Sequence, residues 1–238
     1  MNAIELHDVT RRFGHLTALR GVTLLIPEGQ TFALFGPNGA GKSTLLRIIA
    51  SLGRPSSGTV SIRGIDVRQS PEQVRGHIGL ISHQTLLYDD LTARENLTFY
   101  GKMYGLKNLR ICVDEALETV GLHDRHNDRV RGFSRGMKQR LAIARATLHQ
   151  PEILLLDEPF TGLDTAARSL LSNMIRTLRS KGRTILLVTH DLGQGLTLAS
   201  HFGILRLGEL IHQSPTEAIS EADLRTLYEA RVGNLTRG

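Results

Sequence analysis

The sequence predicts an α/β protein built around a parallel sheet, on three observations. Short apolar runs alternate with helical patterns over much of the chain, an order typical of parallel strands joined by helices. The middle third is helical throughout, which indicates a helical insertion into that core. The chain has 238 residues, of which 40% are hydrophobic, so it is long enough to bury a core of its own.

The first elements are expected to be antiparallel strands. Residues 4–9 and 17–26 carry short alternating apolar patterns, broken by Gly14, Gly21 and the turn at 27–29. The next run, residues 31–35, is rich in β-forming side chains and ends at a cluster of glycines. Apolar residues then recur at helical spacing over 42–52 until Gly53 and Pro55. The order strand, glycine turn, helix follows.

Helix-start signals organise the middle of the chain. Residues 70–73, Ser-Pro-Glu-Gln, have the N-cap, first-position proline and N3 glutamine of a capping box, and predict a short helix before a strand over 77–82. The same box recurs at 92–95 and opens a helix that ends near Gly105. Further helices are predicted over 109–120 and 137–149.

The C-terminal third returns to alternating strands and helices. We expect strands over 152–156 and 184–189 and helices over 166–181 and after Asp191. A hairpin over 201–212 follows, and a helix over 217–231 lies in the tail. This order predicts a single domain, 1–238, with a β subdomain and core (1–84 and 151–213), a helical subdomain (about 85–150) and a C-terminal tail (about 214–238).

Composition excludes several classes of protein. The single cysteine, Cys112, cannot form an internal disulfide or a cysteine-based metal cluster, so a reducing compartment fits best. The longest apolar runs, such as 153–156, are far shorter than the roughly 18 residues that cross a bilayer, and no signal-peptide core is present. The net charge of +6 suits nucleic acid, anionic lipid or a nucleotide, but the charges are spread along the chain, which favours a solvated surface.

The most specific motif is a glycine-rich loop between a predicted strand and a predicted helix. It matches G-x4-G-K-[ST], and its residues are Gly36, Pro37, Asn38, Gly39, Ala40, Gly41, Lys42, Ser43 and Thr44. Glycines let the backbone wrap around phosphates with its N–H groups turned inward, and the helix N-terminus adds positive partial charge. Lys42 would reach the β and γ phosphates and Ser43 would ligate Mg²⁺. The motif predicts a P-loop NTPase (RecA-like) core.

Three further side chains are expected at the same edge of the sheet. Asp157 and Glu158 follow the apolar run 153–156, and the carboxyl ends of parallel strands are where ligands bind. Adjacent positions face different sides, so Asp157 would hold Mg²⁺ while Glu158 faces the attacking water. His190, after the run 185–189, would contact the γ-phosphate or position water.

In this order the motifs resemble the ATP-binding subunits of ABC transporters, over about residues 4–212. The resemblance implies that Phe13 stacks on adenine and that Gln84 contacts Mg²⁺ or the attacking water and senses the membrane partner. It also implies that residues 161–164 form the aspartate loop, which crosses a dimer interface. His190 is similar to the switch histidine of the family.

The signature motif of that family, L-S-G-G-Q, reads Phe-Ser-Arg-Gly-Met at residues 133–137, a departure at three of five positions. The two groups expected to touch phosphate, Ser134 and Gly136, are retained, and Ser134 also suits a helix N-cap. Arg135 and Met137 resemble a variant common in exporter-type members, so we do not interpret them as a loss of activity. Their effect on the γ-phosphate contact is left open by the sequence.

The resemblance implies a mechanism and partners. One chain carries one phosphate loop and one signature, so we expect a head-to-tail dimer, a homodimer or a paired ATPase subunit, with two ATP molecules and Mg²⁺ at the interface. Glu158 would polarise the attacking water. Integral-membrane permease subunits would dock near Gln84, with the ATPase held peripherally at the cytoplasmic face of the cell membrane. Residues 86–88 are candidate contacts, although ordinary packing also explains them, and no nucleic acid partner is expected.

The most specific prediction from the sequence concerns the transported substrate. Residues 81–100 and the run 133–141 most resemble the haem-exporter ATPases of cytochrome c maturation, so haem export for cytochrome c biogenesis is predicted, with a drug or other small-molecule exporter as the alternative. Soluble members acting on ribosomes have two cassettes, and those acting on chromosomes have a long coiled-coil insertion; neither feature is present. A kinase or GTPase with a phosphate loop would lack the 134–136 element and His190.

Overall fold

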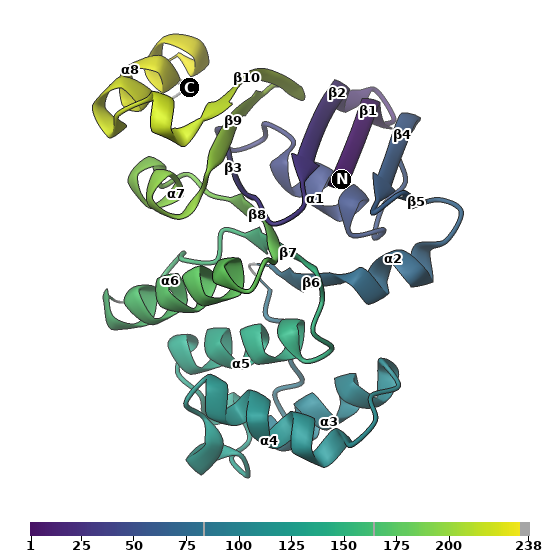
Figure 1. Cartoon of the computed structure of the whole chain (residues 1–238), viewed down its shortest axis with the longest axis vertical. Helices are drawn as coiled ribbons and strands as arrows, with labels where there is room; N and C mark the ends of the chain where they lie inside the picture. The colour runs from purple at the N-terminus through teal and green to yellow at the C-terminus, as the bar shows by residue number, and fades with distance from the viewer. Residues whose placement is uncertain (83, 164, 234–238) are drawn as a thin grey trace.

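Two β-sheets and the helices around them make up the computed structural model of the chain, which describes residues 1–82, 84–163 and 165–233 (Figure 1). The first sheet has the order β2-β1-β4-β5 and is antiparallel. Its strands are β1 (Asn2–Phe13), β2 (Leu16–Pro27), β4 (Ser57–Ile62) and β5 (Ile65–Asp66). The two antiparallel strands predicted at the start of the chain are therefore confirmed, whereas β4 and β5 are additional.

The second sheet has the order β10-β9-β3-β8-β7-β6, in which only the β9–β10 pair is antiparallel. Its strands are β3 (Thr31–Phe35), β6 (Ile78–Ile81), β7 (Ile153–Asp157), β8 (Thr184–Val188), β9 (His201–Arg206) and β10 (Glu209–Pro215). Every residue of β3, β7 and β8 is buried, as expected for parallel strands covered on both faces. The predicted parallel core and its closing hairpin are confirmed.

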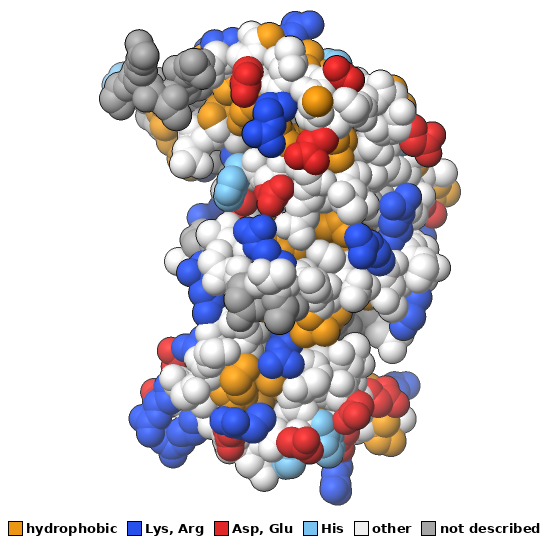
Figure 2. Space-filling model, turned by 90° about the vertical axis from the view of Figure 1, so that its left-hand side faces the viewer, with side chains coloured by type: hydrophobic (Ala, Val, Ile, Leu, Met, Phe, Trp, Pro, Cys, Tyr) orange, Lys and Arg blue, Asp and Glu red, His pale blue; other side chains and the backbone are white. Residues whose placement is uncertain are grey.

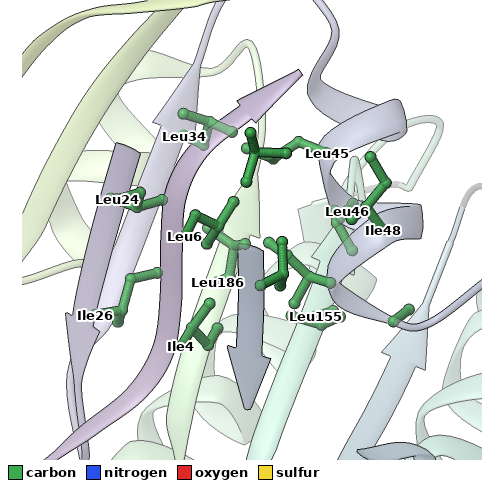
Figure 3. Close-up of a cluster of buried hydrophobic side chains, with 14 of the residues drawn as sticks. Ile4, Leu6, Leu24, Ile26, Leu34, Leu45, Leu46, Ile48, Leu155 and Leu186 are labelled. Carbon is green, nitrogen blue, oxygen red and sulfur yellow. The ribbon is translucent and has the colours of Figure 1, made fainter. Parts of the chain in front are cut away.

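Helix α1 (Lys42–Ile49) joins the two sheets through a shared hydrophobic core. In Figure 3, Leu45, Leu46 and Ile48 of α1 lie opposite side chains of the antiparallel sheet, such as Leu6, and of the parallel sheet, such as Leu155. Close packing of these apolar side chains fixes α1, and the loop before it, relative to both sheets. Further helices around the core are α2 (Pro71–His77), α6 (Thr165–Ser180), α7 (Leu192–Leu198) and α8 (Glu221–Val232), with a 3₁₀ turn at Thr216–Ala218.

The helical middle of the chain packs on a core of its own at the bottom of Figure 1. It contains α3 (Ala93–Met103), α4 (Leu109–Thr119) and α5 (Arg135–Thr147), with 3₁₀ turns at His123–Arg125 and Val130–Gly132. Leu97, Leu117 and Leu141 are fully buried among these helices. The three helices therefore have a hydrophobic cluster of their own, while Ile143 and Ala146 on another side of α5 pack in a second cluster with strands of the parallel sheet.

Capping explains where these helices begin. At α3 both bonds of the box form: the Glu95 N–H donates to Thr92 Oγ1 (3.1 Å) and the Thr92 N–H donates to Glu95 Oε2 (2.8 Å). At α2 the predicted box is wrong, because Ser70 forms no capping bond and its own N–H instead closes a turn onto the Asp66 carbonyl (3.1 Å). The predicted start of α5 at residue 137 is two residues late, since Ser134 accepts from the Met137 N–H (3.2 Å) and caps the helix.

Surface charge and hydropathy agree with the expectations from composition. On the face drawn in Figure 2, Lys and Arg side chains are spread among acidic and uncharged ones and form no single block. Within the described ranges, no helix combines the length and apolarity that a membrane crossing demands.

Candidate nucleotide site

A cleft of about 880 Å³ opens where the strands of the parallel sheet end and the antiparallel sheet begins. Its volume lies in the range of small-molecule sites. Residues from four separate segments line it, and ten of these were predicted from the sequence: Phe13, Asn38, Gly39, Ala40, Gly41, Lys42, Ser43, Thr44, Asp157 and Glu158. The fold thus gathers the phosphate loop, the acid pair and the aromatic residue around one cavity.

The phosphate loop is held by neighbouring backbone. Gly41 has a φ of +104°, and a Cβ there would collide with the Ala18 carbonyl oxygen of β2, so only glycine fits this position. The turn of the β9–β10 hairpin clamps the loop, because the Gly208 N–H donates to the Ala40 carbonyl (2.9 Å) and the Gly208 carbonyl accepts from Arg20 N–H (2.8 Å). The loop conformation is therefore supported by tertiary contacts.

The N-terminus of α1 opens directly into the cleft. Its N-cap residue is Gly41, which has no side chain to cap the first turn. The first N–H groups of a helix have no partner within the helix, and the helix dipole makes this end partly positive. With Lys42, Ser43 and Thr44 lining the cleft, the helix end can accept an anionic phosphate chain.

Lys42 is buried, with only 8% of its surface exposed. Its Nζ donates to the carbonyl oxygens of Gly36 (2.6 Å) and Pro37 (3.0 Å). Burial lowers the pKa of Lys42, and the negative charges of Glu158 and Asp157 oppose that shift. A phosphate oxygen is a stronger acceptor than a carbonyl, so the ammonium can transfer from the loop to a nucleotide in the cleft.

Asp157 and Ser43 supply oxygen donors for a divalent cation. Asp157, the last residue of β7, is 7% exposed, and its carboxylate has no ion pair or hydrogen bond within the described ranges. Both residues line the same cleft. Carboxylate and hydroxyl oxygens are hard ligands of the kind that Mg²⁺ prefers beside phosphates, so these residues fit the expected ion.

Glu158 and His190 are brought together by the sheet. The Glu158 N–H donates to the Val188 carbonyl (2.9 Å), which ties the residue after β7 to the end of β8. At this junction Glu158 adopts φ +50°, a conformation that non-glycine residues rarely take. His190 Nδ1 lies 2.8 Å from Glu158 Oε2. The predicted water-activating acid and the predicted switch histidine therefore form a hydrogen-bonded pair.

Phe13 ends β1 at the rim of the cleft and is half exposed. The Arg11 guanidinium lies 4.4 Å from its ring centroid, a cation–π distance, and so holds one face of the ring. An exposed ring at the edge of a phosphate-binding cleft can stack on a base.

A second hollow, of about 650 Å³, adjoins the first at Glu158, which lines both. Gln84 lies here, exposed, and its carbonyl accepts from Ser82 Oγ (2.6 Å). The structure does not bring Gln84 to the wall of the phosphate-loop cleft, so its predicted contact with Mg²⁺ stays a prediction.

The signature residues lie apart from the cleft of their own chain. Ser134 and Gly136, at the N-terminus of α5, do not line the phosphate-loop cleft. Asp164, the last residue of the predicted aspartate loop, lies outside the described residues. The structure therefore assembles one part of the predicted machinery and leaves the signature on another surface.

Sequence reasoning missed eight residues that line the cleft, and three of them are charged. Arg20 of β2, Arg206 of β9 and Glu209 of β10 line it beside the phosphate loop. None belongs to a recognisable motif, and they meet only because the hairpin packs beside β2, so no local signal was available.

Comparison with known proteins defines the class. The ABC transporter family model matches residues 19–161, and the chain belongs to this family. It is 38% identical over 227 residues to the ABC transporter ATP-binding protein NatA of Bacillus subtilis (strain 168), covering 92% of each chain. It is 35% identical to the linearmycin resistance ATP-binding protein LnrL of the same strain (87% of this chain, 68% of the relative) and 34% identical to the Nod factor export ATP-binding protein I of Cupriavidus metallidurans (93% and 74%).

Solved structures agree. An ATP-binding subunit of an ABC transporter matches with a TM-score of 0.84 and 31% identity, over 97% of this chain and 95% of that chain. A dimeric cassette, MJ0796 bound to ADP and Pi, matches with a TM-score of 0.81 and 30% identity, over 90% and 98%. The P-loop NTPase fold is thereby confirmed, and the chain is an ATP-hydrolysing subunit of an ABC transporter. ATPase subunits of this class dimerise and act with membrane permease subunits.

The relatives do not support the prediction of haem export for cytochrome c biogenesis. Two of their names refer to linearmycin resistance and to Nod factor export, which agree better with the alternative of a drug or other small-molecule exporter. The segments on which the haem prediction depended, residues 81–100 and 133–141, include parts of the glutamine loop and signature, which lie around the ATPase machinery and carry little information about cargo.

Proposed function

We propose that this chain forms an ATP-bridged, head-to-tail dimer that powers export of a drug or other small molecule through a separate permease. One observation carries the dimer: the chain has a complete phosphate-loop cleft, but Ser134 and Gly136 do not line it. In a head-to-tail arrangement, the signature of each subunit closes the cleft of the other. The two contacts are related by a two-fold axis, so they form one isologous interface that holds two sites.

Each residue of the cleft then has a role in phosphoryl transfer. The phosphate loop and Lys42 bind the triphosphate, and Ser43 and Asp157 are the residues that would hold Mg²⁺. When bound, Mg²⁺ neutralises charge that develops on the β and γ phosphates. Glu158 orients and polarises the attacking water, and His190, hydrogen-bonded to Glu158 at 2.8 Å, fixes the carboxylate.

The permease is proposed to dock beside the glutamine loop, on exposed aromatic and aliphatic side chains. Leu86 and Tyr88 are 44% and 49% exposed, whereas Leu87 packs partly into the helical cluster. Phe99 of α3 lies edge-on to Tyr88 at 5.1 Å and is 39% exposed, which extends the surface. Exposed large apolar groups clustered on one surface often mark a protein contact. Docking there would hold the ATPase at the cytoplasmic face of the membrane.

The cargo is tested in the native host. We expect deletion of the gene to increase sensitivity to at least one drug of a tested panel, and wild-type protein, but not Lys42→Ala, to restore resistance. Intracellular accumulation of a fluorescent drug from that panel is measured in the same strains. Normal accumulation together with loss of c-type cytochromes would contradict this proposal and return the assignment to haem export.

A further inference from the structure

We propose that Arg135 is a positioning residue that couples the two ATP sites of the dimer, by joining the signature end of α5 to the loop after Glu158. The inference rests on the proposed head-to-tail dimer. It assigns a role to Arg135, one of the three residues at which this signature departs from the family pattern.

One face of α5 contacts that loop along its length. Arg135, Gln139 and Ile143 are spaced four residues apart, so they lie on one side of the helix. Gln139 Nε2 donates to the Pro159 carbonyl (3.1 Å), and Ile143 shares a buried cluster with Phe160. The face therefore contacts the loop with a hydrogen bond in its centre and apolar packing at its far end.

The third contact is between Arg135 and Gly162. A Cβ placed on Gly162 would overlap with the Arg135 guanidinium, so the planar group occupies space that any other residue at 162 would fill. Gly162 also has a φ of +70°, which glycine adopts without strain. Arg135 and Gly162 are thus fitted to each other.

The loop passes any movement to Glu158. The Thr161 N–H donates to the Glu158 carbonyl (3.2 Å), and the Leu163 N–H donates to the Phe160 carbonyl (3.2 Å). These are successive tight turns that begin at Glu158 itself. The second hollow is lined by Arg135 and Gln139 of α5 and by Glu158 and Thr161 of the loop. The residues that contact the loop and the catalytic acid therefore border the same cavity.

Local energetics do not explain an arginine at this position. Arg135 is exposed in the first turn of α5, where a cation opposes the helix dipole and no acidic residue offsets it. Within the described ranges it has no ion pair or hydrogen bond, and the contact with Gly162 is what the structure offers it.

The arrangement joins the two sites. In the proposed dimer Ser134 and Gly136, which flank Arg135, contact the nucleotide of the partner subunit, while Glu158 acts on the nucleotide of its own chain. A signature drawn toward the partner's phosphate would pull the loop and shift Glu158. Two sites linked in this way give positive cooperativity in ATP hydrolysis.

The test compares three substitutions in purified full-length protein, with ATPase rates measured over a range of ATP concentrations. We expect a Hill coefficient between about 1.5 and 2 for the wild type, near the limit set by two sites. Arg135→Ala should reduce it to about 1 and reduce kcat about tenfold, with KM changed less than about twofold, since the binding cleft is intact. The matched control is Arg176→Ala: Arg176 is an exposed arginine of α6 whose guanidinium, among the described residues, hydrogen-bonds only to Asn173, and the variant should match the wild type.

The other two substitutions separate positioning from direct phosphate contact. Arg135→Gln keeps a planar end group without a charge, and should retain most of the cooperativity. Arg135→Lys keeps the charge without the planar group, and should behave like Arg135→Ala. The opposite order, with Lys active and Gln inactive, would mean that Arg135 binds phosphate and would overturn the proposal.

Gly162→Ala is an independent check, because its Cβ displaces the guanidinium. Gly162→Ala should lower the Hill coefficient as Arg135→Ala does. The variant that combines both substitutions should have a Hill coefficient no lower than that of the more impaired single variant. Thermal unfolding of each variant verifies that it is folded. Wild-type protein that hydrolyses ATP without cooperativity, or Arg135→Ala that keeps it, would overturn this inference, whereas wild-type protein that neither dimerises nor hydrolyses ATP would overturn the proposed function instead.

Discussion

The phosphate-loop edge of the sheet and the signature end of α5 differ in completeness. At the sheet edge, Lys42 at the start of α1 and Asp157 and Glu158 at the end of β7 surround one cleft. His190, which follows β8, is hydrogen-bonded to Glu158. At α5, Ser134 caps a helix whose first turn carries an exposed arginine and no acid. Lys42 and Glu158 at the sheet edge have hydrogen-bond partners within the chain, whereas the signature end of α5 presents its donors to solvent.

The difference between the sheet edge and the signature end of α5 indicates that a catalytic unit contains more than one copy of the chain. At the sheet edge, Lys42 donates to the Gly36 carbonyl and Glu158 pairs with His190 within the same chain. Exposed donors at a helix N-terminus have an unfilled preference for anions. A second copy, bringing its own nucleotide, supplies that anion.

The largest effect is expected from breaking the complete region. Lys42→Ala removes the cation that faces the phosphates and should lower kcat/KM for ATP at least about a hundredfold. Lys107→Ala, an exposed lysine between α3 and α4, is the control and should leave the rate unchanged. Steady-state phosphate release measures both, and a Lys42→Ala protein with near wild-type turnover would show that the cleft is not the hydrolysis site.

A mixing experiment tests whether the two regions belong to different subunits. Ser134→Asp keeps a good N-cap residue but sets a carboxylate against the phosphate, so it should be inactive, as should Lys42→Ala. Mixed in equal amounts, half of the dimers hold one intact site of two, and activity should return to about a quarter of wild type.

Ser134→Asn provides the control for the mixture, because it caps the helix without a charge and should retain much of the activity. No recovery on mixing Lys42→Ala with Ser134→Asp would contradict the head-to-tail arrangement.

The smallest effect is expected on the pH dependence of stability, at His149, where the end of α5 meets the parallel sheet. His149, after α5, stacks on Tyr104 (3.8 Å between centroids), and its Nε2–H donates to the Ile78 carbonyl of β6 (3.1 Å). Burial lowers the pKa of His149 to about 4, and Arg145 adds to that shift, while the Ile78 carbonyl and Glu152 oppose it. Nδ1 is buried without a partner, so protonation there is disfavoured.

The sign follows from the lowered pKa. The unfolded histidine binds a proton below about pH 6.5, whereas the folded one does so only below about 4, so its contribution to stability is present above 6.5 and is lost as the pH falls toward 4. After discounting for partial exposure, this loss is about 1–2 kcal/mol. Urea unfolding at about pH 7 and pH 4.5 should show a larger fall for wild type than for His149→Gln, and equal falls would refute the assignment.

Local patterns predicted the fold where sequence neighbours decide it. Strand β3, the glycine loop and α1 are contiguous, and their order alone indicated the phosphate site. The capping box at Thr92 formed because its residues need only each other. Ser70 has the same pattern, but its backbone is used in a turn with Asp66, which no local rule anticipates.

Long-range contacts explain what was missed. Strand β4 pairs with β1, and β5 pairs with β4, so both depend on partners that their own residue pattern does not specify. Arg206 and Glu209 reach the cleft through the hairpin, and the contact of Arg135 with Gly162 joins a helix to a distant loop. Side-chain identity alone cannot specify such meetings, because the partner is set by the packing of whole elements.

The central claim is that two copies of this chain close on ATP. Glu158→Gln keeps the shape of the side chain but removes the charge that polarises water, so ATP should bind and remain unhydrolysed. Light scattering coupled to size exclusion should then show a dimer of Glu158→Gln with ATP and a monomer without nucleotide, while Glu158→Gln combined with Lys42→Ala stays monomeric. A Glu158→Gln protein that remains monomeric across a range of ATP and Mg²⁺ concentrations would contradict the account.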